Sequence, residues 1–96
     1  MSQILYSHAA LKDLEGIADY TGRMWGSEQA KRYLWEIRGH IRRLPSGGVA
    51  TKPLKLRRGL LFSTPINRHI VIFEATQDHI LVIRILHQSM NLPQHL

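Results

Sequence analysis

The sequence contains no cysteine among its 96 residues. A disulfide framework, a zinc ribbon and a thiol nucleophile are therefore excluded. Long apolar runs are also missing, because the apolar stretches fall well short of the ~20 residues that a membrane span requires. The N-terminal stretch MSQILYSHAA has no basic segment followed by a long apolar run, which is unlike a signal peptide. We therefore expect a soluble, cytoplasmic protein without a membrane partner.

Acidic residues are scarce. Seven Asp and Glu residues stand against thirteen Lys and Arg residues, which gives a formal net charge of +6. Such a surplus favours an anionic partner, which can be nucleic acid, an anionic membrane surface or an acidic protein. The apolar fraction of 44% is normal for a folded chain, and the length suits one domain.

Two helices are predicted from the three- and four-residue spacing of apolar side chains. The first begins after Ser7, which stands at an N-cap position, and it ends at Gly26. The second runs from Glu28 to Leu44, and Ser27 can cap it. Because the link is short, the helices should form an antiparallel hairpin. The buried stripes are expected at Leu11, Leu14, Ile17, Ala18, Thr21, Met24 and Trp25 in the first helix and at Ala30, Leu34, Ile37, Ile41 and Leu44 in the second.

Short apolar runs bounded by turn residues predict the strands. They cover Gln3–Tyr6, Leu56–Thr64, His69–Ala75 and Ile80–Leu86. The β-αα-βββ order predicts an α+β fold, with the helical hairpin packed on one face of a small, mainly antiparallel sheet. Residues 1–96 form one domain, divided into a strand plus helical hairpin (1–44), a loop (45–55), a three-stranded meander (56–87) and a C-terminal tail (88–96).

Six histidines are dispersed along the chain without an HxxxH pair, and no carboxylate lies at ligand spacing beside two of them. We therefore expect neither a metal nor a cofactor. Cleavage of RNA without a metal needs a base, an acid and cations around the phosphate. Those groups could converge from Lys52, Lys55, Arg57, Arg58, Arg84 and His87. Alternatively, 52–58 is a solvated basic segment, and Arg84 either snorkels or pairs with Glu74. Met90, Leu92 and Leu96 would then pack as a short terminal turn.

Three stretches, taken in order, resemble the ParE branch of the RelE/ParE toxin superfamily. The first is DYTGRMWGSEQAKRYL, which is similar to the family's helix-turn-helix. The second is Arg57-x-Gly59-Leu60 with the following INRHIVIF, which resembles two meander strands. The third is the ending ILHQSMNLPQHL. The matching residues of the first stretch are Tyr20, Trp25, Gly26, Gln29, Ala30 and Tyr33.

The resemblance implies a plasmid-stabilising toxin from a bacterial toxin–antitoxin operon, neutralised by a ParD-like antitoxin. The ParE branch acts on DNA gyrase, whereas the RelE branch cuts messenger RNA on the ribosome. Because both branches share the fold, only the site can decide between them. RelE-like nucleases carry arginines along the strand after the basic loop, and this chain reads GLLFSTP there, from Gly59 to Pro65, without a charge. We therefore expect a gyrase inhibitor that is not an enzyme.

The expected sites follow from the same resemblance and from the basic surface. The target-binding set comprises Arg57, Arg58, Arg84, His87, Met90 and Leu92. The antitoxin-binding set comprises Trp35, Arg38 and Arg42, on the outer face of the second helix. DNA is a further expected partner, reached through the antitoxin complex. If the chain is instead a RelE-type endoribonuclease, Arg84 and His87 are the chemical groups, and a plain nucleic-acid-binding module is a third alternative.

The chain also departs from the ParE pattern near its C-terminal end. Ser89 stands where an arginine is common, Asn91 where an aspartate is common, and Phe73-Glu74 where the family often has Tyr-Arg. Each change removes or alters a charge close to the presumed effector end. A weaker toxin, or one directed at another target, is therefore a further alternative.

Overall fold

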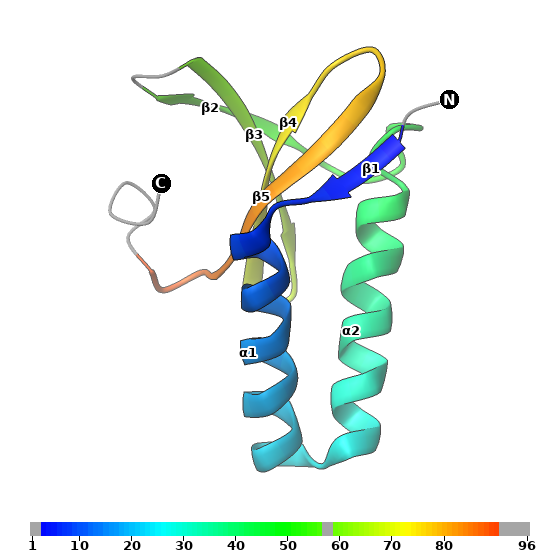
Figure 1. The fold of residues 1–96 in the computed structure, drawn as a ribbon, viewed down its shortest axis with the longest axis vertical. Helices are drawn as coiled ribbons and strands as arrows, with labels where there is room; N and C mark the ends of the chain where they lie inside the picture. The colour runs from blue at the N-terminus through cyan, green and yellow to red at the C-terminus, as the bar shows by residue number, and fades with distance from the viewer. Residues whose placement is uncertain (1–2, 57–58, 91–96) are drawn as a thin grey trace.

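A helical hairpin packs against a five-stranded mixed sheet (Figure 1). The computed structural model describes residues 3–56 and 59–90. The α+β class and the helical hairpin, both predicted from the sequence, are confirmed. The elements in chain order are β1 (Gln3–Tyr6), α1 (His8–Trp25), α2 (Ser27–Arg42), β2 (Lys52–Leu56), β3 (Gly59–Ile66), β4 (His69–Ala75) and β5 (His79–His87).

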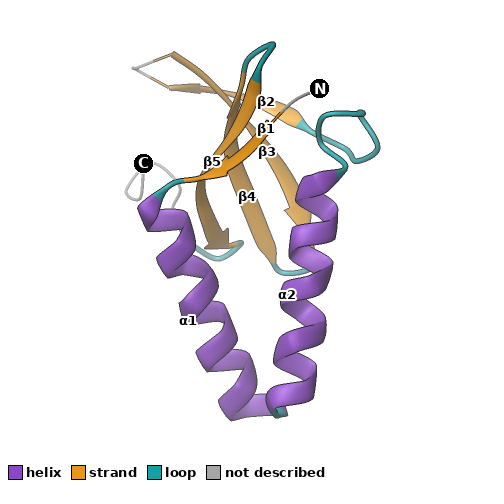
Figure 2. Ribbon diagram, turned by 45° about the vertical axis from the view of Figure 1, so that its right-hand side comes forward, coloured by secondary structure: helices purple, strands orange, loops and turns teal. Residues whose placement is uncertain are grey.

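The sheet has the strand order β1-β5-β4-β3-β2, so the first and last strands of the chain are neighbours. β1 runs parallel to β5, and every other pairing is antiparallel. Both helices lie on the same side of this sheet (Figure 2). In the described part of the chain, neither helix is long and apolar enough to cross a membrane.

The number of strands differs from the sequence prediction. The loop expected at 45–55 contains most of β2, which pairs antiparallel with β3 and forms one edge of the sheet. Its sequence, KPLKL, contains two lysines and Pro53, and these residues indicated a connector rather than a strand. An edge strand tolerates both residue types because part of its backbone pairs with no neighbour. The meander therefore has four strands, and the order is β-αα-ββββ.

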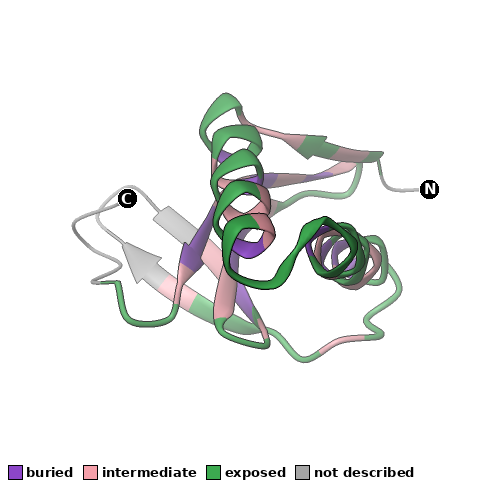
Figure 3. Ribbon diagram, turned by 90° about the horizontal axis from the view of Figure 1, so that it is seen from below, coloured by how far each residue is buried: buried purple, intermediate pink, exposed green. Residues whose placement is uncertain are grey.

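The core lies between the hairpin and the sheet. The stripe predicted for α2 is confirmed, since Ile37 and Ile41 are completely buried against strand residues such as Val71 and Val82. The stripe predicted for α1 is only partly buried. Its Trp25 is 71% exposed, because the hairpin turn projects beyond the sheet (Figures 1 and 3). The exposed members of that stripe are Leu11, Met24 and Trp25.

Gly26 makes the hairpin turn possible. Its φ of +95° lies in the region that favours glycine, and the residue closes α1 and opens α2 at once. Its N–H donates to the Gly22 carbonyl at 2.9 Å. Ser27, expected to cap the second helix, is instead the first residue of α2, and no side chain caps that helix.

β5 contains a bulge that is fastened to the start of α1. Phe73 pairs with Val82 and Ile72 pairs with Arg84, so Ile83 is the additional residue. The Ser7 hydroxyl donates to the Ile83 carbonyl at 2.7 Å, and it also accepts from the Ala10 N–H as the predicted N-cap. The N-terminus of α1 is therefore tied to the irregular point of β5.

Candidate functional site

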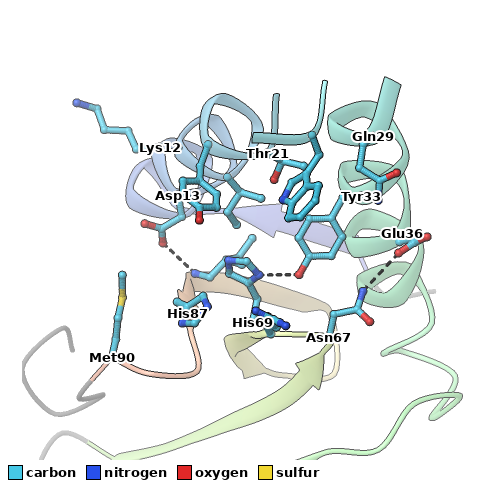
Figure 4. Close-up of a pocket in the computed structure, with 16 residues that line it drawn as sticks. Lys12, Asp13, Thr21, Gln29, Tyr33, Glu36, Asn67, His69, His87 and Met90 are labelled. Carbon is cyan, nitrogen blue, oxygen red and sulfur yellow. Dashed lines mark hydrogen bonds between the residues drawn. The ribbon is translucent and has the colours of Figure 1, made fainter. Parts of the chain in front are cut away.

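A cleft of about 1160 Å³ opens between the hairpin and the end of the sheet where β4 begins and β5 ends (Figure 4). Ile17, Tyr20 and Trp25 line it with apolar and aromatic surface, and Met90 lines it from the segment after β5. Its polar lining comprises Tyr33, His69, His87, Asn67, Gln29, Thr21 and the charged residues Lys12, Asp13, Glu36 and Arg68. The cleft therefore combines an apolar wall with a cluster of titratable groups.

Two histidines and a tyrosine meet in this cleft. The Tyr33 hydroxyl lies 2.6 Å from Nδ1 of His69, and the His69 and His87 rings meet edge to face with centroids 5.4 Å apart. The Ser89 N–H donates to Nδ1 of His87 at 3.2 Å, which requires that nitrogen to be unprotonated. We assign the Tyr33 proton to the short contact with His69, because the Ile66 carbonyl is 3.5 Å away.

With these assignments both imidazoles are neutral and carry their proton on Nε2. Burial lowers the pKa of His69, and the neighbouring His87 lowers it further, whereas the Asp13 carboxylate acts in the opposite direction. Burial also raises the pKa of Tyr33. At neutral pH His69 therefore presents an imidazole N–H donor rather than an imidazolium charge.

The bulge in β5 is what places His87 opposite His69. Before the bulge, Ala75 pairs with Ile80, and an unbroken ladder would continue to bring Leu86 opposite His69. The additional residue shifts the register by one, so that His69 pairs with His87. Because side chains alternate between the faces of a sheet, the same shift turns His87 toward the hairpin side.

Arg84 is held by its own chain. Its Nε donates to Oδ2 of Asp13 at 2.8 Å and its Nη2 donates to Oδ1 at 3.0 Å, a bidentate ion pair. The same carboxylate accepts the Ile85 N–H at 2.8 Å. The expected pairing of Arg84 with Glu74 is wrong, since Glu74 lies 3.5 Å from Nε2 of His79. The bond to Asp13 raises the pKa of Arg84, so its charge is permanent.

Of the six predicted target-binding residues, the structure describes Arg84, His87 and Met90. His87 and Met90 both line the cleft, and Met90 is 43% exposed. Arg84 belongs to the ion pair with Asp13 instead. The remaining members, Arg57, Arg58 and Leu92, lie outside the described residues.

The predicted antitoxin-binding residues lie together on α2, away from the cleft. The Arg42 guanidinium lies 5.3 Å from the centre of the Trp35 ring, and the Arg38 guanidinium lies 5.4 Å from that of Tyr6. Trp35 is 71% exposed. We call Trp35, Arg38 and Arg42 the basic stripe. Helical periodicity places it on the side of α2 opposite the residues that line the cleft.

The sequence prediction did not assign Tyr33, His69 or Arg68 to a site. A partial signal was present, since His69 begins one predicted strand and His87 follows the end of the next. Among the described residues, no group of three His, Asp or Glu side chains could hold a metal ion.

The sequence matches a known family over nearly its whole length. The family model described as the ParE toxin of the type II toxin-antitoxin system, parDE, matches residues 4–92. "Toxin ParE1" of Caulobacter vibrioides is 33% identical over 91 residues, which are 94% of this chain and 93% of the relative. "Toxin ParE" of Escherichia coli is 30% identical over 93 residues, which are 96% of this chain and 90% of the relative.

Solved structures share the fold of this chain. A chain of the chromosomal ParDE TA system from P. aeruginosa superposes with a TM-score of 0.74 at 18% identity, covering 91% of this chain and 96% of that one. The YoeB dimer from Staphylococcus aureus gives a TM-score of 0.65 at 17% identity, covering 90% of this chain and 95% of that one. At such identities the likeness concerns the fold alone.

Proposed function

Because the chain belongs to the ParE toxin family of type II toxin–antitoxin systems, we propose that it acts in the cytoplasm by binding DNA gyrase and inhibiting it. Its neutralising partner would be a ParD-like antitoxin, and the complex of the two would contact DNA. The inhibition would need no covalent chemistry by the toxin itself.

The observation that carries this proposal is the engagement of Arg84 by Asp13. Cleavage of RNA requires cations placed around the phosphate as charge develops. The Arg84 guanidinium forks onto a carboxylate of its own chain, and β3 has the uncharged sequence GLLFSTPI. Neither Arg84 nor β3 therefore supplies a cation for a phosphate, which favours binding of gyrase over cleavage of RNA.

The proposed gyrase-binding surface keeps the residues expected from the sequence. His87 and Met90 would contact the target directly from the rim of the cleft, together with Arg57, Arg58 and Leu92. Arg84 would act through Asp13 as a positioning residue that fixes the end of β5. The gyrase face that accepts this surface would be acidic, or would carry bound DNA, since the chain is strongly basic.

The antitoxin would use two surfaces of the hairpin. Acidic side chains would pair with the basic stripe, where Arg38 and Arg42 are exposed beside aromatic rings. An amphipathic segment would fill the cleft with its apolar side chains, which is a common mode of peptide recognition. Reaching both surfaces requires a segment that wraps around α2.

The test is a supercoiling assay with purified gyrase and ATP, run beside messenger RNA cleavage on programmed ribosomes with the same toxin preparation. We expect inhibited supercoiling or accumulated cleaved DNA, with intact messenger RNA. Addition of the antitoxin should restore supercoiling. Cut messenger RNA with unaffected gyrase would overturn the proposal.

A ribosome-dependent endoribonuclease of the RelE type is the second candidate. The observation in its favour is the His69–His87 pair, because two imidazoles can serve as base and acid, and Arg68 lines the same cleft. This reading requires that His87→Ala abolish cleavage while ribosome binding persists. An Arg84→Ala variant should lose cleavage as well, unless its role is only to position β5.

A further inference from the structure

We propose that the His69–His87 end of the cleft binds the carboxylate of an acidic residue of the antitoxin. In the antitoxin segment, this acidic residue would lie between apolar residues. This inference rests on the proposed antitoxin partner and specifies the chemistry that the partner brings into the cleft. It adds an acidic anchor inside the cleft to the acidic contacts expected at the basic stripe.

The donors for a carboxylate are already placed. The Nδ1 atoms of His69 and His87 are occupied by Tyr33 and Ser89, which leaves the N–H on Nε2 of each ring. Within the described residues, no hydrogen bond involves either Nε2 atom. Because no buried side-chain nitrogen there lacks a partner, both Nε2 atoms are accessible to a ligand. Two N–H donors on rings whose centroids are 5.4 Å apart suit the two oxygens of one carboxylate.

The charges around the pair favour an incoming anion. Lys12 and Arg68 line the cleft as cations. The Asp13 carboxylate that lines it is compensated by Arg84 and the Ile85 N–H, and Glu36 accepts from the Asn67 side chain at 3.4 Å. The charge of Asp13 is therefore balanced by Arg84, whereas Glu36 is only hydrogen-bonded, and the donors on the two imidazoles remain available.

The rest of the cleft fits a peptide better than a nucleic acid. Its apolar wall offers Ile17, Tyr20 and Met90 to apolar side chains that flank the acid. A nucleic acid has a phosphate at every nucleotide, and these phosphates would be repelled by the carboxylates of Asp13 and Glu36. A peptide with a single acidic residue between apolar residues would bring only one negative charge, and it would place that charge at the Nε2 donors of His69 and His87.

Binding of a carboxylate at this point should be linked to pH. The titratable and charged groups that line the cleft with the histidine pair are Lys12 and Asp13 of α1, Tyr33 and Glu36 of α2, and Arg68 before β4, and Arg84 pairs with Asp13. An added carboxylate stabilises an imidazolium, so the complex should take up a proton when it forms. That proton would go to an Nδ1 atom, which would then donate to the hydroxyl oxygen of Tyr33 or Ser89 instead of accepting a hydrogen bond. Affinity should therefore rise as the pH falls from about 8 to about 6, by at most ~10-fold per pH unit for one proton.

The experiment measures the dissociation constant of this chain and the antitoxin encoded beside it by titration calorimetry. His87→Leu removes the donor and should weaken binding by roughly 10- to 100-fold. His87→Gln keeps an N–H donor but cannot take up a proton, so it should retain most of the affinity and lose the pH dependence. The matched control is His8→Leu, at the exposed start of α1, which should change affinity less than about 2-fold.

The antitoxin side is tested by replacing each of its acidic residues with the corresponding amide. Replacing the acidic residue that contacts His87 should weaken binding to the wild-type chain. The same replacement should cost little further affinity when the chain carries His87→Leu. Circular dichroism of each variant checks that it is folded. A second variant, His69→Leu, keeps His87 and should show the same loss of affinity for the antitoxin.

The outcomes separate the two proposals. If the antitoxin does not bind the wild-type chain, the proposed function and this inference both fail. If it binds, and the leucine variants bind equally well at every pH, only this inference is wrong. The inference also fails if no acidic residue of the antitoxin couples to His87, or if His87→Leu abolishes binding of a short RNA but leaves antitoxin binding intact.

Discussion

Asp13 joins three parts of the molecule through one carboxylate. It stands on α1, it holds the Arg84 guanidinium in a bidentate pair, and it accepts the Ile85 N–H just beyond the bulge. A bulge interrupts regular strand pairing, and here a side chain from another element supplies an acceptor at the irregular stretch. The register that brings His87 into the cleft therefore depends on a residue far from it in sequence.

We expect Asp13→Ala to lower the free energy of unfolding by about 2–3 kcal/mol, because it removes charge-assisted hydrogen bonds from a partly buried site. Chemical denaturation at neutral pH measures the change. Asp19→Ala, an exposed position on the same helix, should change stability by less than about 0.5 kcal/mol. Equal effects of the two substitutions would show that the bridge to β5 contributes nothing beyond surface charge.

Two histidines should make the fold sensitive to acid. Burial lowers the pKa of His69 and of His40, and the nearby Arg43 lowers that of His40 further. Nε2 of His40 lies 2.7 Å from the Thr64 hydroxyl, which itself donates to the Ala50 carbonyl, so this imidazole donates in its neutral form. For each histidine, the pKa in the unfolded chain is higher than the pKa in the folded chain. Between these two values, the unfolded chain binds more protons than the folded chain.

Stability should therefore fall as the pH drops below the ordinary histidine value of 6.5 toward the lowered values of the folded state. The slope is at most ~1.4 kcal/mol per pH unit for each histidine. Urea denaturation from about pH 8 to about pH 5 measures it. The double variant His40→Gln, His69→Gln should have a shallower slope than His8→Gln, and an unchanged slope would contradict this account.

Among the elements, those defined by local pattern were predicted well. The predicted ranges of β1 and β4 match the structure, because short apolar runs and flanking turn residues mark them. β2 was missed because its own sequence is that of a basic connector. β2 forms a strand because it pairs with β3, and this pairing cannot be inferred from the local sequence of β2.

The candidate site was harder to predict for the same reason. The turn between β4 and β5 fixes a register that would place Leu86 opposite His69, and only the bulge replaces it with His87. Tyr33 reaches His69 from α2, through packing of the hairpin on the sheet. A histidine at each of two strand ends was visible in the sequence, but their meeting depended on a one-residue irregularity.

The start of α1 offers a test at this scale. Ser7→Ala removes the N-cap bond to Ala10 and the bond to the Ile83 carbonyl, so we expect a loss of about 1–2 kcal/mol. Thermal and chemical unfolding measure it. Ser27→Ala is the matched control, because no side chain caps α2, and it should cost less than about 0.5 kcal/mol.

At the scale of the whole molecule, two candidate binding surfaces lie on different sides of α2. The basic stripe lies on one side, and the cleft with its histidine pair lies on the other. An exposed charge at the rim of an interface mainly affects the rate of association, whereas buried contacts mainly affect dissociation. The stripe should therefore attract the antitoxin and the cleft should retain it.

We expect the association rate constant with the antitoxin to fall roughly tenfold between about 50 mM and about 500 mM NaCl. Arg42→Ala should lower the rate at low salt and weaken its salt dependence, with a smaller change in dissociation. Arg23→Ala removes the same charge at the other end of the hairpin and should have less effect. Stopped-flow mixing measures both rates, and identical behaviour of the two variants would rule out a local role for the stripe.

The parallel pairing of β1 with β5 bears on how this protein is made. β1 is translated before the hairpin and the other strands, yet its partner strand is the last of the described elements. Ser7 and Asp13 also find their partners only on β5. A nascent chain therefore cannot complete its sheet, or bring His69 and His87 together, until β5 has been translated. Formation of the cleft has to wait for the last of the described strands, although β1 and the hairpin precede it in the chain.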